Sequence, residues 1–375
     1  MKILIANHHL VHYGGTELYV YTLVGELQKQ GHETVVFSPL LGEAPARIRE
    51  AGIRVVDDFE EISSERFDLI HGHHRRPTLL AFSFFPFTPL VYVTHGFLPH
   101  VLAFEAPPAP PVVVEKFIAV CEEVKTHLVD NFTISERDIE VVVNPVDVER
   151  FKPRRQIDQA VRRVLLISSN KNRVQKELVE QACFRLGLKL EIIGWEKRAW
   201  NVEDYINEAD LVVALGRGAM EGLACGRAVV VCGGKGCDGM VTEENIDDLL
   251  ETNFSGKRYG RPTTLETLID EFRKYDPGMG RVNRQLALER FDAQRQARKL
   301  VEIYQRAIEN SPRKEASLTP GEKIGLLESY LIDLAKQSKE TEVGVLREKI
   351  ARLQEEVVIL RELVRAMSKD GSSEP

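Results

Sequence analysis

The chain has no long hydrophobic run and few cysteines, and both absences limit what it can be. None of its apolar stretches approaches the roughly 18 residues that a membrane-spanning helix needs. Its first residues, Met1 to Ala6, are too short for a signal peptide and predict a first strand. The five cysteines form no C-x-x-C pair, and this usage is typical of a reduced cytoplasm rather than of a disulfide framework or a zinc site. We therefore expect a cytoplasmic protein.

Positively charged residues, which nucleic-acid binding requires, are also scarce in the first half of the chain. Residues 1–150 carry 12 Lys and Arg against 21 Asp and Glu, whereas residues 151–310 carry 27 against 24. The acidic first half argues against nucleic acid or an anionic membrane surface as a partner, and an anionic nucleotide would be better received by the second half. No G-x-G-x-x-G follows the first strand, which disfavours a redox dinucleotide.

What the chain does have is an alternation of apolar strands and amphipathic helices. A length of 375 residues suggests two domains and an appendage. In the first half we expect helices over 16–30 and 121–131, and short apolar strands, which predict a doubly wound parallel sheet. These strands are 2–6, 33–38, 54–57, 69–71, 90–94, 117–120 and 139–143.

A second α/β set follows a predicted break at Asn144-Pro145 and a predicted linker at 151–155. Its predicted strands are 164–168, 189–193, 211–215 and 228–232, its predicted helices include 175–186, and one long helix is expected over 284–309. The expected domains are therefore 1–153 and 154–310, both Rossmann-like.

The C-terminal part differs from both domains. Residues 311–341 predict a linker and helical segment, and residues 342–368 repeat in heptads. The a positions are β-branched and the d positions are Leu or Met, a pattern that favours a parallel two-stranded coiled coil from Val343 to Met367. We expect a homodimer, and the alternative is one amphipathic helix that docks on its own globular domain.

The stretch 211–226, LVVALGRGAMEGLACG, carries the most chemistry. A buried strand is expected to end at a turn of Gly216, Arg217 and Gly218, followed by a short helix with Glu221. Open α/β sheets bind ligands at the carboxyl ends of their strands, and a helix start suits a phosphate. Glu221 would accept hydrogen bonds from sugar hydroxyls, or it merely stabilises the helix dipole.

This stretch resembles the donor site of family 4 glycosyltransferases, which have the two-domain GT-B fold. Their E-A-M-A-C-G pattern is matched by residues 221–226. The resemblance implies that Glu221 holds the ribose of a nucleotide sugar and acts at the catalytic centre. The family has a second Glu eight residues earlier, where this chain has Val213. Similar matches at 117–122 and 143–153 depart from the family at Cys121 and Pro145.

The first half carries two further matches. Gly14-Gly15-Thr16-Glu17 is similar to the family's Gly-Gly-x-Glu, which implies that Gly14 and Gly15 flank the donor diphosphate or the acceptor, with Glu17 on the acceptor side. The alternative is a helix that Thr16 caps. His95, after the fifth strand, matches a histidine that the family places near the donor sugar, and the alternative is a histidine that caps the strand end.

Other polar residues are candidates without a motif. His73 and His74 end the fourth strand and could face the acceptor, and no carboxylate or thiol lies near enough in sequence to complete a metal site. Lys171, Arg173 and Lys176 are candidates for the diphosphate, although their spacing does not match the family's Arg and Lys, and a solvated loop explains them equally well.

Together these features predict a glycosyltransferase of polysaccharide biosynthesis. The family resemblance implies a nucleotide-diphosphate sugar donor, a glycan, polysaccharide or lipid-linked acceptor, retention of anomeric configuration and no cofactor or metal. Such a protein would be cytoplasmic, or peripheral at the inner membrane face. The alternative is a non-catalytic GT-B scaffold or partner subunit of a glycan-assembly complex, which Val213 and the coiled coil favour.

Overall fold

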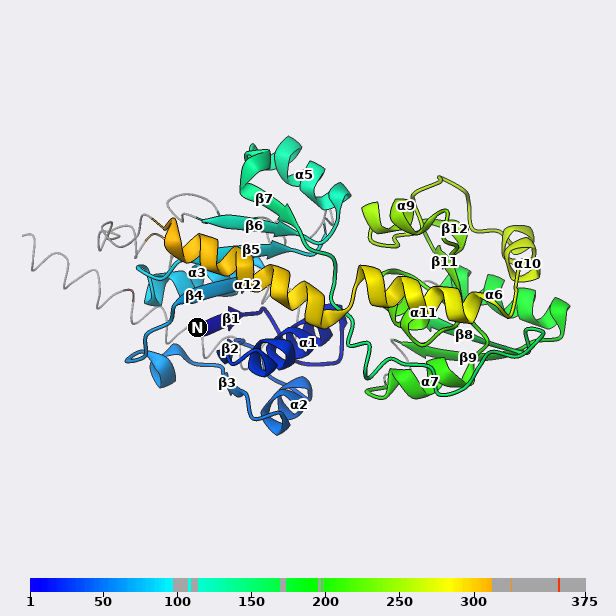
Figure 1. The fold of residues 1–375 in the computed structure, drawn as a ribbon, viewed down its shortest axis with the longest axis horizontal. Coiled ribbons are helices and arrows are strands. Elements are labelled where there is room, and N and C mark those ends of the chain that lie inside the picture. Colours follow the sequence, from blue (N-terminus) through cyan, green and yellow to red (C-terminus); the bar gives the residue numbers. More distant parts are fainter. Residues whose placement is uncertain are drawn as a thin grey trace, which may run out of the picture.

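The computed structural model contains two sheets, each packed between helices. It describes residues 1–96, 107–108, 114–168, 173–194, 197 and 199–311, with the single residues 325 and 357. Figure 1 shows two bodies side by side, one built on strands β1 to β7 and the other on β8 to β12. The predicted class, two doubly wound α/β units, is confirmed.

The first sheet has the strand order β3-β2-β1-β4-β5-β6-β7, and all its paired strands are parallel. Its strands are β1 (Lys2–Ala6), β2 (Glu33–Phe37), β3 (Arg54–Val56), β4 (Leu69–His73), β5 (Leu90–Thr94), β6 (Lys116–Ala119) and β7 (Ile139–Val141). The predicted strands differ from these by two residues or fewer at either end. The helical elements of this half are α1 (Gly15–Lys29), α2 (Ala44–Glu50), η1 (Phe59–Ile62), α3 (Arg75–Phe84), α5 (Glu122–Phe132) and η3 (Glu136–Asp138).

Helices cover both faces of this sheet, which explains why its strands are apolar on both sides. One hydrophobic cluster joins the sheet to α1, α2 and α5, and its members include Ile5, Leu23 and Leu128. The other joins the opposite face to η1 and α3, through residues such as Leu4 and Phe82.

The second sheet has the order β12-β11-β10-β8-β9. Its strands are β8 (Arg163–Ser168), β9 (Lys189–Gly194), β10 (Leu211–Ala214), β11 (Ala228–Gly233) and β12 (Gly236–Met240). One face packs against α7 (Val202–Glu208), α8 (Gly216–Ala224), α9 (Ile246–Glu251) and α11 (Met279–Arg290), and the other against α6 (Arg173–Leu186) and α10 (Leu265–Arg273). Strand β12 runs antiparallel to β11. The sequence did not predict β12, because its glycines and Asp238 hide the apolar pattern of a buried strand.

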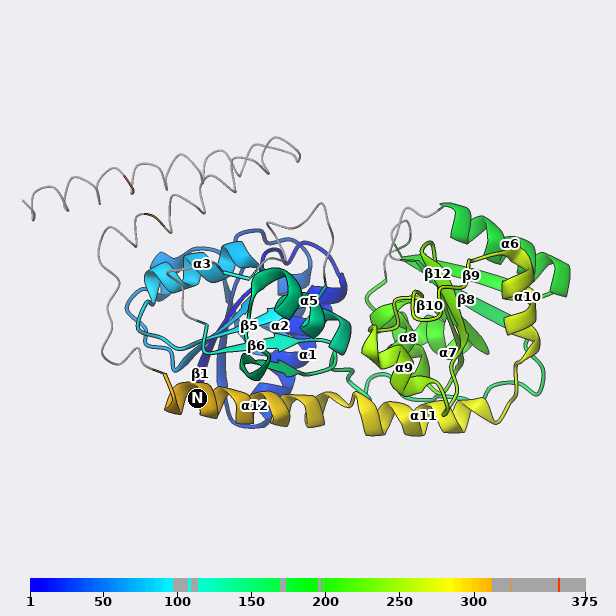
Figure 2. The same ribbon diagram turned by 90° about the horizontal axis from the view of Figure 1, so that it is seen from above.

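The prediction of one long helix over 284–309 is wrong. The structure has α11 and then α12 (Ala293–Glu309), which lie end to end along one side of both bodies (Figure 2). Two causes separate them. The Asp292 side chain caps α12 by accepting from the Gln294 N–H at 3.1 Å. The backbone of Val146 also inserts at the break, accepting from Ala293 N–H and donating to the Phe291 carbonyl, both at 2.9 Å.

Helix α12 follows the second sheet in sequence and yet packs on the first. Its Leu300, Ile303 and Tyr304 are fully buried in the cluster that contains α1. The chain thus crosses between the bodies twice, once at Val146 and once at the break between α11 and α12. The domain limits at 153 and 154 stay a prediction.

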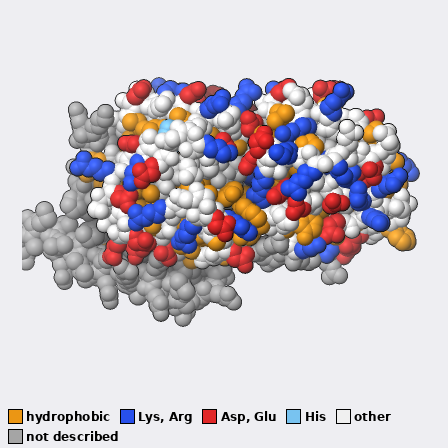
Figure 3. Space-filling view, turned by 60° about the horizontal axis from the view of Figure 1, so that its bottom comes forward, with side chains coloured by type: hydrophobic (Ala, Val, Ile, Leu, Met, Phe, Trp, Pro, Cys, Tyr) orange, Lys and Arg blue, Asp and Glu red, His pale blue; other side chains and the backbone are white. Residues whose placement is uncertain are grey.

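Nearly all of the predicted linker at 311–341 and the coiled coil at 342–368 lies outside the described residues. Val357, a predicted a position, is described: it is 6% exposed and belongs to the cluster that contains α3. In the described part of the chain, no helix is both long and apolar enough to cross a membrane. The face in Figure 3 shows acidic and basic side chains interspersed, without one large patch of either sign.

Candidate active site

Helix α8 begins almost directly after β10. The predicted turn at Gly216-Arg217-Gly218 is wrong, since all three residues lie in the first turn of α8 and Leu215 alone connects strand and helix. The chain turns this sharply because Gly216 adopts a positive φ of 52°, and its N–H donates to the Phe254 carbonyl at 3.0 Å. Gly226, with φ 63°, follows the helix end as predicted.

The remaining glycines of α8 bring the helix close to the sheet. A Cβ at Gly218 would lie 3.3 Å from the Cβ of Ala214, and one at Gly222 would lie 3.0 Å from Cγ2 of Val229. These two positions are four residues apart and so share one face of the helix. Gly218 therefore allows close packing of α8 against β10, and the roles of Gly216, Arg217 and Gly218 in binding a donor stay a prediction.

Glu221 is held by an arginine of its own helix. Its carboxylate is 4% exposed, and Oε1 accepts from Nε of Arg217 at 2.7 Å. Burial raises the pKa of Glu221, while the charge and hydrogen bond of Arg217 oppose that rise. The remaining nitrogens of Arg217 donate to the Pro145 carbonyl and to Oγ1 of Thr22, both at 3.0 Å. Thr22 lies on α1, so this arginine joins the two bodies.

The second carboxylate that the family resemblance implies has no place at position 213. Val213 is fully buried in β10 and packs in the cluster that contains α6 and α10. A carboxylate there would lie in the core of the sheet.

The glycine pair at the start of α1 holds a folded-back carboxylate. Gly14 is the N-cap of α1, so no side chain caps this helix. Thr16 lies inside the first turn, and the alternative in which it caps the helix is wrong. Glu17 is 5% exposed, and its Oε2 accepts from the Thr16 hydroxyl at 3.1 Å. A Cβ at Gly14 would lie 2.6 Å from that same oxygen, whereas a Cβ at Gly15 would meet nothing within 4 Å. Gly15 therefore leaves open space beside the helix start.

Histidines gather at the carboxyl ends of β4 and β5. Nδ1 of His73 lies 2.7 Å from Nε2 of His95, and their rings stack with centroids 5.0 Å apart. Tyr19, on α1, packs edge-on against both rings. His71 lies behind them and hydrogen-bonds the hydroxyl of Tyr304, on α12, at 2.5 Å. The structure therefore brings together His95 and His73, which sequence reasoning placed on the donor and acceptor sides separately.

Burial keeps this cluster neutral. It lowers the pKa of His95 to about 4 and that of His71 to about 3, and it lowers the pKa of His73 well below the usual value. Neutral imidazoles can share one proton along the bond between His73 and His95. No group of three or more potential metal ligands occurs among the described residues.

The other predicted residues lie around this centre or outside the described part. His74 is the N-cap of α3, is buried, has a positive φ of 65°, and its ring lies 6.1 Å from that of His95. Lys171 is not described. Arg173 begins α6, and Lys176 lies on the first turns of the same helix. Their relation to a diphosphate stays a prediction.

Sequence reasoning missed the residues that hold the two bodies together. Trp200, before α7, packs against Tyr13 and Tyr21 of the first body with centroids 4.8 and 4.9 Å apart. Arg150 lies over the same indole at 4.3 Å. The side-chain amide of Asn144 donates to Oδ1 of Asn253 at 3.0 Å, close to the point where the chain first crosses between the bodies. Asn144 and Arg150 lie within the matched stretch 143–153, but their contacts could not be predicted, because each acts through a partner that is distant in sequence.

The comparisons with known proteins agree with this geometry. Residues 13–150 match the model of Glycosyltransferase Family 4, a range that includes Gly14, Glu17 and His95. A glycosyltransferase from Rickettsia africae ESF-5 has a TM-score of 0.60 and 17% identity, over 83% of this chain and 99% of that one. The chain has the GT-B fold, and its residues 13–150 resemble family 4 glycosyltransferases.

Two further solved structures share the fold of this chain. Anabaena HepE, in complex with UDP and glucose, gives a TM-score of 0.57 and 15% identity over 81% of this chain and 99% of its own. A putative UDP-N-acetylglucosamine 2-epimerase from Listeria monocytogenes gives a TM-score of 0.51 and 14% identity, over 85% of this chain and 99% of its own. The search of curated proteins finds no match. Since an epimerase has the same fold, the fold alone does not decide the reaction.

Proposed function

We propose that this protein transfers a sugar from a nucleotide-diphosphate sugar to a glycan, polysaccharide or lipid-linked acceptor, with retention of configuration. The observation that carries the proposal is the contact between Arg217 and Thr22, 3.0 Å apart. It brings α8, which bears the donor motif, against α1, which begins with the Gly14-Gly15 motif. A UDP-sugar is the first donor to test, because HepE was solved with UDP and glucose.

In this proposal the donor lies between the two bodies. Glu221 keeps Oε2 for a ribose hydroxyl, since Arg217 bonds Oε1. The same guanidinium provides positive charge near the diphosphate, and Lys171, Arg173 and Lys176 are further candidates for that role. The open side of Gly15 allows a phosphate or acceptor to approach the start of α1.

His95 would support the donor sugar as a neutral imidazole. Its pKa of about 4 keeps it uncharged near neutral pH, so that it acts as a hydrogen-bond partner for a hydroxyl. In the reaction the bond between the anomeric carbon and the phosphate oxygen breaks and a bond to the acceptor oxygen forms. The acceptor proton leaves with the nucleoside diphosphate. The acceptor would approach from the side of Glu17, His73 and His74, at the cytoplasmic face of a membrane if it is lipid-linked.

The second candidate function is a non-catalytic GT-B scaffold or partner subunit. Two observations favour it: Glu221 is already paired with Arg217, and Val213 lies in the core. A nucleotide would have to share the Arg217–Glu221 pair, and a scaffold would use the pair only to join α8 to α1.

Ligand-induced thermal stabilisation separates the two functions. The unfolding midpoint of the full chain is measured with UDP, GDP, CMP and their sugars, for the wild type, for Glu221→Gln and for the exposed control Glu251→Gln. A midpoint that rises with one nucleotide in the wild type and the control, and not in Glu221→Gln, supports the donor site. Release of free nucleotide from the stabilising sugar then tests turnover. No response to any nucleotide would reject the catalytic proposal.

A further inference from the structure

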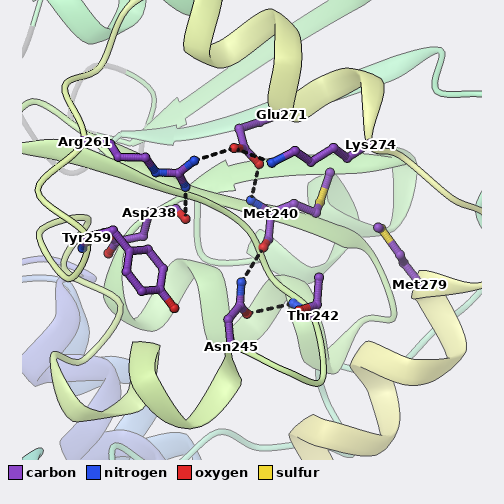
Figure 4. Close-up of a pocket in the computed structure, with 9 residues that line it drawn as sticks. All are labelled: Asp238, Met240, Thr242, Asn245, Tyr259, Arg261, Glu271, Lys274 and Met279. Atoms are coloured by element: carbon purple, nitrogen blue, oxygen red, sulfur yellow. Dashed lines mark hydrogen bonds and ion pairs between the residues drawn. The ribbon is translucent and has the colours of Figure 1, made fainter.

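A polar cavity lies at the outer edge of the second sheet. It has a volume of about 440 Å³, and it is formed by the edge strand β12, the loop at 259–261 and helix α10. Figure 4 shows that Tyr259, Arg261, Glu271 and Lys274 surround it. None of the residues that we assign to the nucleotide or the acceptor lines this cavity.

Asp238 is the unusual residue in the cavity. It comes from β12, is 1% exposed, and its Oδ1 accepts from the Tyr259 N–H at 3.0 Å. Its Oδ2 is buried and has no hydrogen-bond partner among the described residues. A buried carboxylate oxygen without a hydrogen-bond partner costs more free energy than a buried neutral group without one. This oxygen is therefore placed to accept a hydrogen bond from a ligand.

The neighbouring charges are balanced and largely satisfied. Glu271 is 2% exposed and accepts from Arg261 at 2.9 Å, Lys274 at 2.8 Å and the Met240 N–H at 2.8 Å. Two carboxylates and two cations therefore line the cavity. An anionic ligand would meet Asp238 and Glu271, and a cationic one would meet Arg261 and Lys274. A neutral ligand avoids both costs.

The hydrogen-bonding groups of the cavity fit hydroxyls. Asp238 offers an acceptor, while Arg261 has a buried Nε without a partner and so offers a donor. A hydroxyl both donates and accepts, and it satisfies either group. The Tyr259 ring is 40% exposed and lies beside Asp238 in Figure 4, where it presents an apolar face to a ligand. Its hydroxyl donates to the exposed Asp248 at 3.1 Å, and the Arg261 guanidinium carbon lies 5.9 Å from the ring centroid.

We propose that this cavity binds a neutral sugar ring, with a hydroxyl donating to Oδ2 of Asp238 and the ring lying against Tyr259. The site is separate from the one proposed for the nucleotide sugar, and it does not depend on transferase activity. It would hold a glycan chain on the second body at a distance from the reacting end.

Saturation-transfer NMR on the full chain tests this site with the methyl glycosides of glucose, galactose, mannose and N-acetylglucosamine. We expect at least one glycoside to bind the wild type and to bind at least fivefold more weakly to Asp238→Asn, in which an amide donor can replace the free acceptor. The matched control is Asp270→Asn, which removes an exposed carboxylate of α10 outside the cavity lining and should bind as the wild type does. Tyr259→Ala, at a partly exposed position, provides a second variant if Asp238→Asn folds poorly.

The outcomes distinguish this site from the nucleotide site. Binding that persists in both Asp238→Asn and Tyr259→Ala would overturn the proposal, as would binding lost in Glu221→Gln. Absence of binding by all four glycosides would also overturn it. Addition of UDP should leave the signal unchanged, whereas competition by UDP would place the sugar in the cleft and reject a separate site.

Discussion

Arg217 of the second body donates to the Thr22 hydroxyl of the first at 3.0 Å, from the same guanidinium that pairs with Glu221 at 2.7 Å. The Glu221 carboxylate and the contact between the two bodies thus depend on one side chain. If a nucleotide binds at Glu221 as proposed, its binding would change the contact with α1.

Replacement of Arg217 tests that dual role. Arg217→Ala leaves Glu221 buried without its partner, and we expect the free energy of unfolding to fall by about 3 kcal/mol. Thr22→Val removes only the contact between the bodies and should cost about 1 kcal/mol. Chemical denaturation measures both. Equal losses in the two variants would show that Glu221 does not depend on Arg217.

The glycine pair at the start of α1 offers a matched comparison. Gly14→Ala places a Cβ 2.6 Å from Oε2 of Glu17, so the flexible carboxylate must move away from Thr16. We expect a loss of about 1 kcal/mol or less in stability and a reduction of transfer activity. Gly15→Ala meets no atom and should leave stability within about 0.5 kcal/mol. If it lowers nucleotide or acceptor affinity, the open side of Gly15 is a ligand contact.

Position 213 tests the assignment of the missing carboxylate. Val213→Glu buries a charge in the core between β8 and β11, and we expect little folded protein. Val213→Ala should fold with a loss of about 2 kcal/mol, because it leaves only a small cavity. Circular dichroism and thermal unfolding check both variants. A folded Val213→Glu protein that binds nucleotide sugar more tightly would contradict the core position.

The buried histidines predict how stability depends on pH. Their pKa values in the folded protein lie below the ordinary value of about 6.5, so the unfolded chain binds more protons in acid. The stability that the neutral histidines contribute is complete above pH 6.5. It is lost as the pH falls toward the pKa of about 4 for His95 and of about 3 for His71. Each such histidine contributes a slope of about 1.4 kcal/mol per pH unit.

Denaturation curves between pH 7 and 5 measure this slope. The variant His71→Gln should reduce it by about one proton, because His71 is fully buried. An unchanged slope in His71→Gln would mean that His71 is not the neutral group that its burial implies.

The C-terminal heptads predict the oligomeric state. Light scattering on the full chain should give a dimer, and deletion of residues 312–375 should give a monomer. Val357 is buried in the cluster that contains α3, as expected of the alternative in which the helix docks on its own domain. A full-length monomer that loses stability on deletion would support that alternative. A dimer that persists after deletion would reject the coiled coil as its cause.

The sequence by itself determined the fold class and most strands, because each strand is an apolar run bounded by glycine or polar residues. It also pointed to Glu221, Gly14 and His95 as candidate site residues, since their motifs are local. These signals depend on neighbours within a few residues, and such neighbours are visible in one dimension.

Only the tertiary structure decided what these residues contact. The pairing of Arg217 with Thr22, and of His73 with His95, joins groups that lie 195 and 22 residues apart. The break before α12 also depends on a distant residue, Val146, whose backbone inserts at Phe291. The position of Val213 in the core and the partnerless Oδ2 of Asp238 follow from packing in three dimensions, which no local spacing encodes.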